Sequence, residues 1–384
     1  YNTPQSAIHY YQQVGRAGRA LEDAFGICLL GAEDEVINNY FIEKAFPKMP
    51  AFKSVIDCLE KADRPMKEYE MRFKCNISPG HLKKLLRILG SLESAPILKV
   101  SENRWVRTAN PLQIDWEKVE EIEEQRFLEW NSMKEYINSQ SCLMQFLAKN
   151  LSDNIAKKCG RCSNCDPLSI LELKNQDLLI KASKYLKRTN VLIEPRKSWI
   201  HDYSFKAWPQ FKGSISEDQK LEEGKALCFL SDSVYGPRIF KGKKDLVFDD
   251  ELIRASIDEV LKADNWIYKN KISHITCVPS LEKPSLVPSF AEKLAFDLNL
   301  PFINCVSKIK ENKPQKLMQN SFYQRRNLDG AFNVDLNKVT NNSNILLIDD
   351  IVDSRWTLTI IGALLKEAGA DKVFPFCLAN QVNN

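Results

Sequence analysis

Three cysteines fall within seven residues of this 384-residue sequence, and a fourth precedes them. Cys159, Cys162 and Cys165 form two consecutive C-x2-C steps, and Cys142 lies 17 positions before Cys159. Four thiolates at this spacing close a tetrahedron around Zn²⁺, which makes a structural site with no open position for water. An iron–sulfur cluster takes the same number of cysteines and stays an alternative, whereas free thiols explain so dense a group poorly. We therefore predict a zinc site at these four cysteines.

Composition narrows the class of protein further. The chain has eleven cysteines, and the scatter of those outside the group indicates reduced thiols in a cytosolic protein rather than a disulfide framework. The formal net charge of +4 is too mild to indicate a nucleic-acid partner unless basic residues gather locally. No apolar run reaches about 18 residues, and the N-terminal residues hold no apolar signal core. We expect no membrane span and no secretory signal.

A helical hairpin is expected to carry the four cysteines. Residues 115–138 begin with an acidic run, which we interpret as a solvated face, and continue with apolar residues three and four positions apart. A second helix bearing Cys142 continues this apolar stripe. Such a stripe is more typical of a hairpin core than of a ligand site.

The first 20 residues contain a second motif with chemical meaning. Gln12 precedes Arg16 and Arg19, which share one face of a helical turn, and the glycines beside them permit close backbone approach to a ligand. Such arginines suit stabilisation of charge on a transferring γ-phosphoryl group, although a helix end with two solvated arginines fits the same spacing. The run YYQQVGRAGRA resembles motif VI of superfamily-2 helicases, and its paired tyrosines are typical of the RecQ family.

This resemblance implies that Gln12, Arg16 and Arg19 serve an ATP site, with Mg²⁺, at the cleft between two RecA-like lobes. The chain contains neither a G-x-x-x-x-G-K-[ST] loop nor a DExH box, both of which lie upstream of motif VI in a helicase. We therefore expect residues 1–48 to be the end of the second lobe, with its last strand at 21–32. This chain alone is not expected to hydrolyse ATP.

The next region has the pattern of a winged helix. Amphipathic stretches predict three helices and a β-hairpin, over 51–61, 65–73, 78–90 and 96–107. The third helix has a serine N-cap followed by proline and carries leucines at helical spacing. Three helices and a β-wing make up a winged helix, a relative of the helix-turn-helix.

Local charge favours a DNA-binding role for this region. Residues 61–110 carry 11 basic and 5 acidic side chains, a local balance of +6. Phosphate contact and base stacking are the expected roles of residues on the third helix and in the wing. These residues are His81, Lys83, Lys84, Arg87, Arg104 and Trp105. A solvated basic face around a leucine core is the alternative, and Trp105 suits the core as well as a stacking platform.

The CGRCSNCDP run on a helical hairpin resembles the zinc-binding subdomain of RecQ helicases. This similarity is independent of motif VI, so the two reinforce each other. In the usual RecQ order the zinc subdomain precedes the winged helix, whereas here the winged helix comes first. The reversed order indicates a divergent RecQ-like branch.

From residue 249 the pattern alternates between helix and strand. We expect helices over 249–264, 286–298 and 357–368, and strands over 273–278, 302–306, 344–348 and 372–377. Such alternation favours a parallel sheet covered on both faces. For 196–248 the sequence indicates only short strands and turns.

One strand of this region ends in two acidic residues and opens into a helix. Because α/β sheets bind ligands at this end, the acids suit ribose hydroxyls and the loop suits a 5′-phosphate, although an N-cap with two surface acids also fits. The run ILLIDDIVDSRWT resembles the PRPP-binding motif of type I phosphoribosyltransferases, with Arg-Trp where a glycine is usual. This resemblance implies a phosphate or PRPP-like ligand, or a nucleotide, at Asp349, Asp350, Asp353, Ser354, Arg355 and Thr357.

Further short runs resemble the ComF group of phosphoribosyltransferase-like proteins: residues 278–280, 315–317 and 325–332. The stretch 308–326 holds six basic residues and one acidic residue. A mobile loop over a phosphate pocket, a patch for single-stranded DNA and a plain solvated loop all fit this composition. The DNA interpretation assigns Lys316, Arg325 and Arg326.

The sequence thus predicts a multidomain α/β plus α protein. Its expected parts are the end of a RecA-like lobe (1–48), a winged helix (49–111), a zinc-binding helical hairpin (112–168), a connector with a small β-containing region (169–248) and a phosphoribosyltransferase-like domain (249–384). We expect the C-terminal part of a bacterial, cytoplasmic, nucleoid-associated RecQ-like DNA helicase that binds DNA and a phosphorylated ligand. The alternatives are a phosphoribosyltransferase acting on a nucleobase or nucleic acid, and a non-catalytic DNA-binding scaffold.

Overall fold

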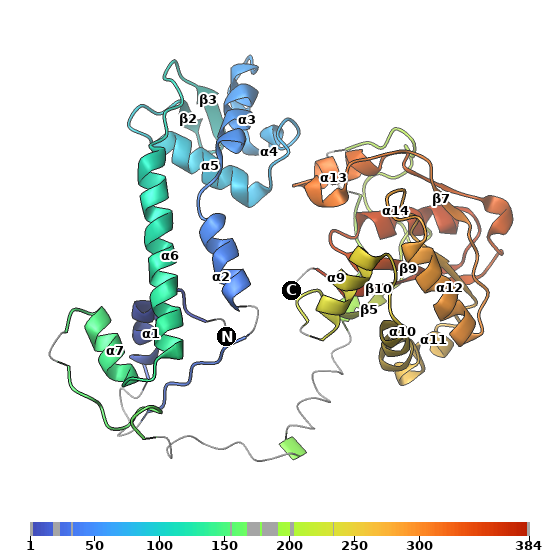
Figure 1. Ribbon diagram of the computed structural model, residues 1–384. Helices are drawn as coiled ribbons and strands as arrows, with labels where there is room; N and C mark the ends of the chain where they lie inside the picture. Colours follow the sequence, from blue (N-terminus) through green and yellow to red (C-terminus); the bar gives the residue numbers. More distant parts are fainter. Residues whose placement is uncertain are drawn as a thin grey trace. The chain divides into compact units, whose positions relative to one another are not determined.

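The computed structural model divides the chain into two compact units, an N-terminal unit (residues 1–75 and 79–174) and a C-terminal unit (residues 76–78 and 175–384) (Figure 1). The structure describes residues 3–17, 24–31, 34–153, 156–166, 177–178, 191–199, 203–232 and 234–381. None of the helices in these ranges combines the length and apolar character needed to cross a membrane.

One half of the N-terminal unit is built on a long helix, α6 (Trp116–Asn138), which Asp115 caps by accepting the Lys118 N–H. The other helices of this half are α1 (Ala7–Val14), α2 (Asp34–Glu43) and α7 (Leu143–Asn150). Their shared core contains Tyr10 of α1, whose ring lies 5.2 Å from that of Tyr136, together with Trp130 and Met133. The expected hairpin core is therefore confirmed, and the helix of the Gln12 motif belongs to it.

The other half of this unit holds α3 (Met49–Glu60), β1 (Met66–Lys67), α4 (Glu68–Met71), α5 (Pro79–Ser91), β2 (Ile97–Ser101) and β3 (Arg104–Arg107). The strands form one antiparallel sheet in the order β1-β3-β2. The leucines of α5 are almost fully buried, as their helical spacing predicts, and burial of each stabilises the fold by about 1.5–3 kcal/mol. The helices expected over 51–61 and 78–90 and the hairpin expected over 96–107 are present near those positions, whereas the helix expected over 65–73 is reduced to the four-residue α4, preceded by strand β1.

The strand expected at 21–32 is not present in the part of it that the structure describes. Residues 24–31 form no regular secondary structure, and residues 18–23 and 32–33 lie outside the described residues. Phe25, Ile27 and Leu29 are exposed by 80, 72 and 67 %. A strand is stable only when neighbours satisfy its backbone groups, and no described strand pairs with this segment.

The C-terminal unit is built on a sheet with strand order β4-β5-β10-β9-β6. The strands are β4 (Val191–Ile193), β5 (Gly224–Phe229), β6 (His274–Cys277), β9 (Asn344–Val352) and β10 (Lys372–Asn380). All neighbours run parallel except β4, which pairs antiparallel with β5 at the edge. The expectation of a parallel sheet is confirmed for the other four strands, and the sheet as a whole is mixed.

Alternate residues of β9 face two separate cores. Ile345 and Leu347 pack with α14 (Trp356–Glu367), whereas Leu346 and Ile348 pack with α10 (Asp250–Ala255) and α12 (Leu286–Leu298) on the other face. Figure 1 shows these helices on either side of the strands. The remaining helices of the unit are α9 (Tyr235–Asp245), η2 (Ser256–Leu261), η3 (Ala263–Asn265), α11 (Trp266–Lys269), η4 (Gln315–Leu317), α13 (Ser321–Leu328) and η5 (Leu336–Lys338).

Two expectations about this unit are wrong. A domain boundary at 249 divides one sheet, because β4 and β5 precede it and β5 pairs with β10 in its middle. The strand expected at 302–306 is reduced to a single bridge between Phe302 and Ile275. The chain leaves the main sheet there and forms β7 (Val306–Lys308), which pairs antiparallel with β8 (Phe332–Val334).

Candidate functional site

The four predicted metal ligands lie together in the N-terminal unit. The Sγ atoms of Cys142, Cys159, Cys162 and Cys165 are all within 4.8 Å of one another. Cys142 is the N-cap of α7 rather than a residue within the helix, and the others lie in the loop at 159–165. Gly160 has a positive φ of 73°, which lets the loop turn back on itself. Four thiolates about 2.3 Å from a central Zn²⁺ fit this arrangement.

Backbone N–H groups point at the sulfurs. Leu143 N–H donates to Cys162 Sγ over 3.4 Å, and Cys159 N–H donates to Cys142 Sγ over 3.2 Å. Burial works to raise the pKa of the Cys162 thiol, but the N–H groups and neighbouring thiols outweigh it and lower that pKa to about 6. The Gly160 N–H lowers the pKa of Cys165, but burial and the other thiols raise it to about 11. The thiols thus share protons, and a divalent cation would let all four ionise together.

The second candidate site lies at the carboxyl end of the C-terminal sheet. β9 continues to Val352, beyond the expected end at 348, so Asp349 and Asp350 lie inside the strand, in its C-terminal half, where Asp349 pairs in register with Cys377 of β10. The loop that follows leads directly into α14. The structure therefore brings the acidic pair and the predicted phosphate loop together, as the sequence pattern indicates.

The two carboxyl groups differ in their surroundings. Burial, and then the negative charge of Asp350, raise the pKa of Asp349 to about 8, so this carboxyl is protonated at neutral pH. Asp350 instead forms a 2.6 Å ion pair with Lys243 of α9. The Lys243 carbonyl in turn accepts a hydrogen bond from the Lys283 side chain. One acid thus supplies a proton for hydrogen bonding, and the other supplies a charge that a lysine neutralises.

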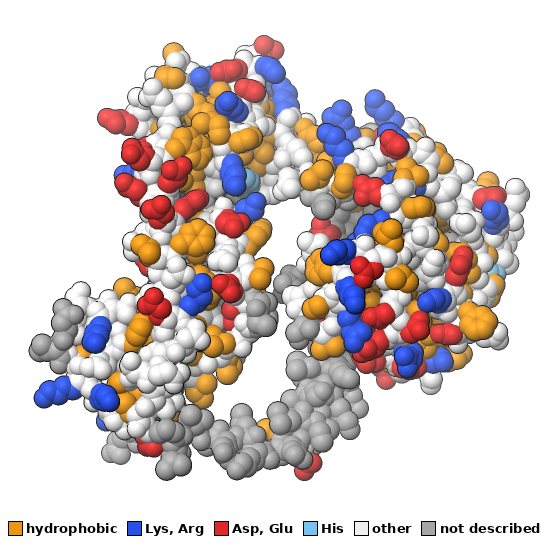
Figure 2. Space-filling view, in the orientation of Figure 1, with side chains coloured by type: hydrophobic (Ala, Val, Ile, Leu, Met, Phe, Trp, Pro, Cys, Tyr) orange, Lys and Arg blue, Asp and Glu red, His pale blue; other side chains and the backbone are white. Residues whose placement is uncertain are grey.

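Sequence reasoning missed Lys243. The basic side chains of α9 gather on one side of the unit (Figure 2), but nothing in the chain order relates this helix to β9. Only the sheet order brings α9, which follows β5, near the end of β9. A run of basic residues in a helix is usually a solvated face, so the sequence carried no specific signal.

The phosphate loop has an unusual conformation at Arg355. This residue has φ 66° and ψ 1°, the left-handed region that the usual glycine adopts without strain. Asp353 is exposed, whereas Ser354 and Thr357 are half-buried. Trp356 is fully buried and packs near Trp199, with ring centroids 6.3 Å apart. The loop therefore takes up the left-handed conformation without a glycine, and the tryptophan is part of the core.

The predicted DNA-binding residues divide into surface and core positions. Lys83, Arg87 and Arg326 are exposed, while His81 and Arg104 are half-buried. Lys84 is exposed, but its side chain donates a hydrogen bond to the Ala45 carbonyl. The side chain of Lys316 lies outside what the structure describes.

Two of the DNA assignments are corrected. Arg325 is 1 % exposed, and its guanidinium donates to the carbonyls of Ser321 and Trp199, so it is a core residue. Trp105 is buried against Gly90, where an added Cβ would lie 3.1 Å from the indole ring. Both side chains face protein rather than solvent, and neither is available as a stacking platform or phosphate contact.

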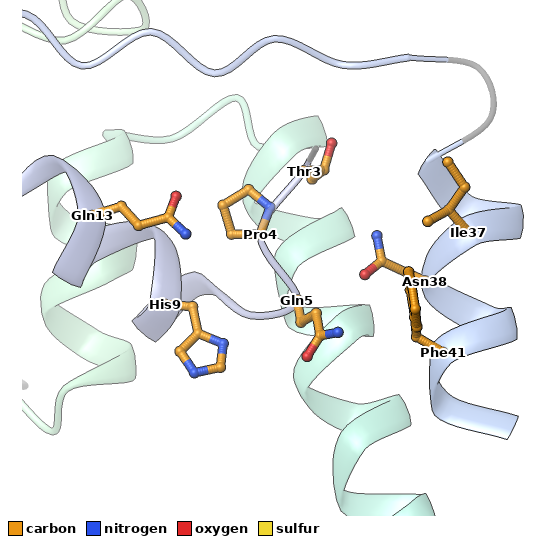
Figure 3. A pocket seen from close by; sticks show the side chains of 8 residues that line it. All are labelled: Thr3, Pro4, Gln5, His9, Gln13, Ile37, Asn38 and Phe41. Carbon is orange, nitrogen blue, oxygen red and sulfur yellow. The ribbon is translucent and has the colours of Figure 1, made fainter. Parts of the chain in front are cut away.

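The Gln12 motif lies at the end of α1. Gln12 and Arg16 are exposed, and Arg19 lies outside the described residues. A hollow of about 270 Å³ lies beside this helix, lined by His9 and Gln13 of α1, by residues 3–5 and by Ile37, Asn38 and Phe41 of α2 (Figure 3). It contains neither Gln12 nor Arg16, so the predicted ATP-site residues do not converge on it.

Comparison with known proteins gave structural likenesses only. No protein-family model matches the chain, and a search of curated proteins found no match. An adenine phosphoribosyltransferase from Saccharomyces cerevisiae, solved with an imino-altritol bisphosphate and adenine, is 19 % identical, with 34 % of this chain and 70 % of that chain covered and a TM-score of 0.25. Another adenine phosphoribosyltransferase is 19 % identical, with 37 % and 73 % covered and a TM-score of 0.26. Both scores are low, so the function proposed for this chain rests on its own residues.

Proposed function

We propose that the C-terminal unit binds a phosphorylated ribose of the PRPP type. The observation that carries this proposal is the position of Asp349 and Asp350 near the carboxyl end of β9, the strand whose following loop opens α14. In parallel α/β sheets this edge is where ligands bind, and carboxyl groups there reach the hydroxyls of a sugar. The sequence resemblance to the PRPP-binding motif covers these same residues.

The two acids have complementary roles in this proposal. The protonated Asp349 donates a hydrogen bond to a ribose oxygen, and Asp350 accepts one from a ribose hydroxyl. Lys243 balances the charge of Asp350, and in this proposal it supplies a cation for a phosphate group of the ligand. Ser354 and Thr357 supply hydroxyl donors in the loop. A transferase of this class would break the bond from ribose C1 to pyrophosphate and form one from C1 to an acceptor nitrogen.

Calorimetric titration of the whole chain with PRPP and Mg²⁺ tests this function. Asp350→Asn is expected to weaken binding about tenfold, since a hydrogen bond to a charged group contributes about 1.5–3 kcal/mol. Asp371→Asn is the matched control, because Asp371 is exposed and lies before β10, at the opposite end of the strands. Absence of PRPP binding by the unchanged chain would refute the proposal. Pyrophosphate release in the presence of nucleobases measures transfer separately.

For the N-terminal unit we propose a zinc-bound, DNA-binding module of a RecQ-like helicase. The observation that favours this second function is that the motif VI helix α1 and the zinc hairpin α6–α7 share one core. The order α3-β1-α4-α5-β2-β3, with a three-stranded antiparallel sheet, supports the winged-helix assignment. Filter binding of duplex DNA across salt concentrations tests it, and a flat salt dependence would contradict phosphate contact.

A further inference from the structure

A group of arginines surrounds Trp356 beside the phosphate loop. Arg196 follows β4, Arg325 lies in α13 and Arg355 is the N-cap of α14. The guanidinium carbon of Arg196 lies 3.7 Å from the centre of the Trp356 ring, and that of Arg325 lies 5.2 Å from it. The indole face attracts both cations, which offsets part of the cost of holding them close together.

Arg196 and Arg355 tie the loop to the segment after β4 in a reciprocal way. Arg196 Nη1 donates to the Ser354 carbonyl over 2.8 Å, and Arg355 Nη1 donates to the Glu194 carbonyl over 2.9 Å. Arg196 thus bonds to the residue just before Arg355, and Arg355 bonds to a residue two positions before Arg196. We call Arg196 and Arg355 the arginine pair. Their hydrogen bonds to backbone carbonyls hold both guanidiniums at the loop, and neither bond involves an acidic side chain.

No acidic side chain among the described residues neutralises the charge of the arginine pair. Neither guanidinium forms an ion pair with an acidic side chain in the described part of the chain, and the Nε atoms of both are buried without a hydrogen-bond partner. Burial, and then the charges of Arg355 and Arg325, lower the pKa of Arg196 to about 10. Arg355 also lies at the N-terminus of α14, the positive end of the helix dipole. The mutual repulsion of the guanidiniums and the positive end of the helix dipole both favour an anion at this place.

We propose that Arg196 and Arg355 form a binding site that selects a terminal phosphate, that is, a phosphate monoester. A guanidinium can donate two parallel N–H bonds to two oxygens of one phosphate group. A phosphate monoester carries almost two negative charges at neutral pH, whereas a diester carries one. This inference rests on the proposed function, because both use the loop at 353–357. It differs in that two guanidiniums, rather than the backbone of a glycine-containing loop, recognise the phosphate. Either a phosphorylated sugar or the 5′-phosphate end of a DNA strand presents this group.

The test compares anions on the whole chain, in EDTA so that no divalent cation contributes. Calorimetry is run with inorganic phosphate, ribose 5-phosphate, dimethyl phosphate and a ten-nucleotide thymidine strand with or without its 5′-phosphate. Binding of phosphate and ribose 5-phosphate, with no binding of dimethyl phosphate, is expected. A stronger affinity for the 5′-phosphorylated strand than for the 5′-hydroxyl strand identifies DNA ends as ligands, and equal affinity of the two strands restricts the site to small molecules.

Variants then assign the binding to the arginine pair. Arg355→Asn keeps a residue type that tolerates the left-handed conformation, and Arg196→Gln keeps a hydrogen-bond donor. Each is expected to bind inorganic phosphate about tenfold more weakly, with thermal unfolding as the check that the fold persists. Arg254→Gln, at an exposed residue of α10, removes the same charge elsewhere and is expected to leave affinity unchanged. No binding of phosphate by the unchanged chain, or unchanged affinity in folded Arg355→Asn and Arg196→Gln, would overturn the inference.

One further variant separates this inference from the proposed function. The double change Asp349→Asn and Asp350→Asn leaves the arginine pair intact, so phosphate affinity is expected to persist while any preference for ribose 5-phosphate over phosphate disappears. Persistence of that preference contradicts the proposed role of the acids alone. Loss of arginine dependence contradicts the anion site alone.

Discussion

The zinc-binding loop holds groups that can become negatively charged close together, and the phosphate loop does the same with positively charged groups. Cys142 caps α7 beside three other thiols, and Arg355 caps α14 near two other guanidiniums. Like charges are held close together in both places. The thiols lie at a helix N-terminus, which favours their ionised form, whereas the guanidiniums oppose the helix dipole there. A bound cation relieves the first arrangement, and a bound anion relieves the second.

The two regions also differ in how they are assembled. Three of the four thiols come from one short loop, so their spacing is written locally in the sequence. The guanidiniums come from three distant segments, and Arg196 and Ser354 are 158 positions apart. A local cluster of like charge is therefore visible in a sequence, whereas a tertiary cluster of like charge is visible only in the fold.

The largest expected effect is loss of the metal. Cys162→Ser removes one of four ligands, and we expect the zinc content to fall from about one ion per chain to nearly none, because a structural site needs all four. The stability of the N-terminal unit should fall with it, since the free energy of metal binding contributes to folding. Atomic absorption and urea unfolding measure the two effects. Cys28→Ser, outside the cluster, is the control, and retained zinc in Cys162→Ser would contradict the four-thiolate site.

The aromatic support of the guanidinium cluster is tested next. Trp356→Ala removes a fully buried indole that contacts Trp199 and the Arg196 guanidinium. Loss of a buried tryptophan of this kind destabilises a domain by about 3–5 kcal/mol, which urea unfolding measures. Addition of saturating phosphate should recover part of this loss if the anion site survives. A destabilisation below about 1 kcal/mol would show that the ring is not part of the core.

The protonated acid gives a smaller effect with a definite sign. The pKa of Asp349 is about 8 in the folded chain against 3.8 ordinarily. Between these values the folded state holds more protons than the unfolded state, so stability falls as the pH rises from about 4 to 8, by at most about 1.4 kcal/mol per pH unit. Asp349→Asn removes this dependence. Its unfolding midpoint in urea should exceed that of the unchanged chain by a margin that grows between pH 5 and 8, and a constant margin would contradict the raised pKa.

The smallest expected effect concerns DNA, and it tests whether the N-terminal unit also contacts phosphate groups, those of the DNA backbone. Lys83→Gln removes one exposed charge from α5, and we expect duplex DNA to bind slightly more weakly, with the slope of log affinity against log salt reduced by about 1. Lys118→Gln, at an exposed position of α6, should leave the slope unchanged. Equal slopes for Lys83→Gln and the unchanged chain would remove α5 from the DNA contact.

Several features of the fold could be predicted because they are local. The leucine spacing of α5, the serine before it, the proline at its first position, and the alternation around β9 and α14 each indicate the element that is present. The predicted helix at 286–298 coincides with α12. Hydrophobic periodicity and capping depend on neighbours a few positions away, so they are visible without a fold.

Other features could not be predicted in the same way. The region before residue 249 has few periodic signals, yet β5 is an interior strand of the sheet. Its pairing with β10 links residues about 150 positions apart. Arg325 has the composition of a surface residue, but carbonyl groups from other segments satisfy its buried guanidinium. Burial of a charge depends on partners that the sequence alone does not identify.

The sequence by itself determined the four-cysteine group, the acidic pair after a run of apolar strand residues and the absence of glycine in the following loop. Tertiary structure alone decided that Lys243 pairs with Asp350 and that Arg196 meets the loop at Ser354. For Lys243 the physical reason is the strand order β4-β5-β10-β9-β6, in which β5 and β9 run parallel, so the segment after β5 lies at the edge where β9 ends. The antiparallel β4 ends beside Gly224, at the start of β5, so the contact of Arg196 with Ser354 depends on packing outside the sheet. Chain order does not contain that arrangement, because packing between distant segments selects it.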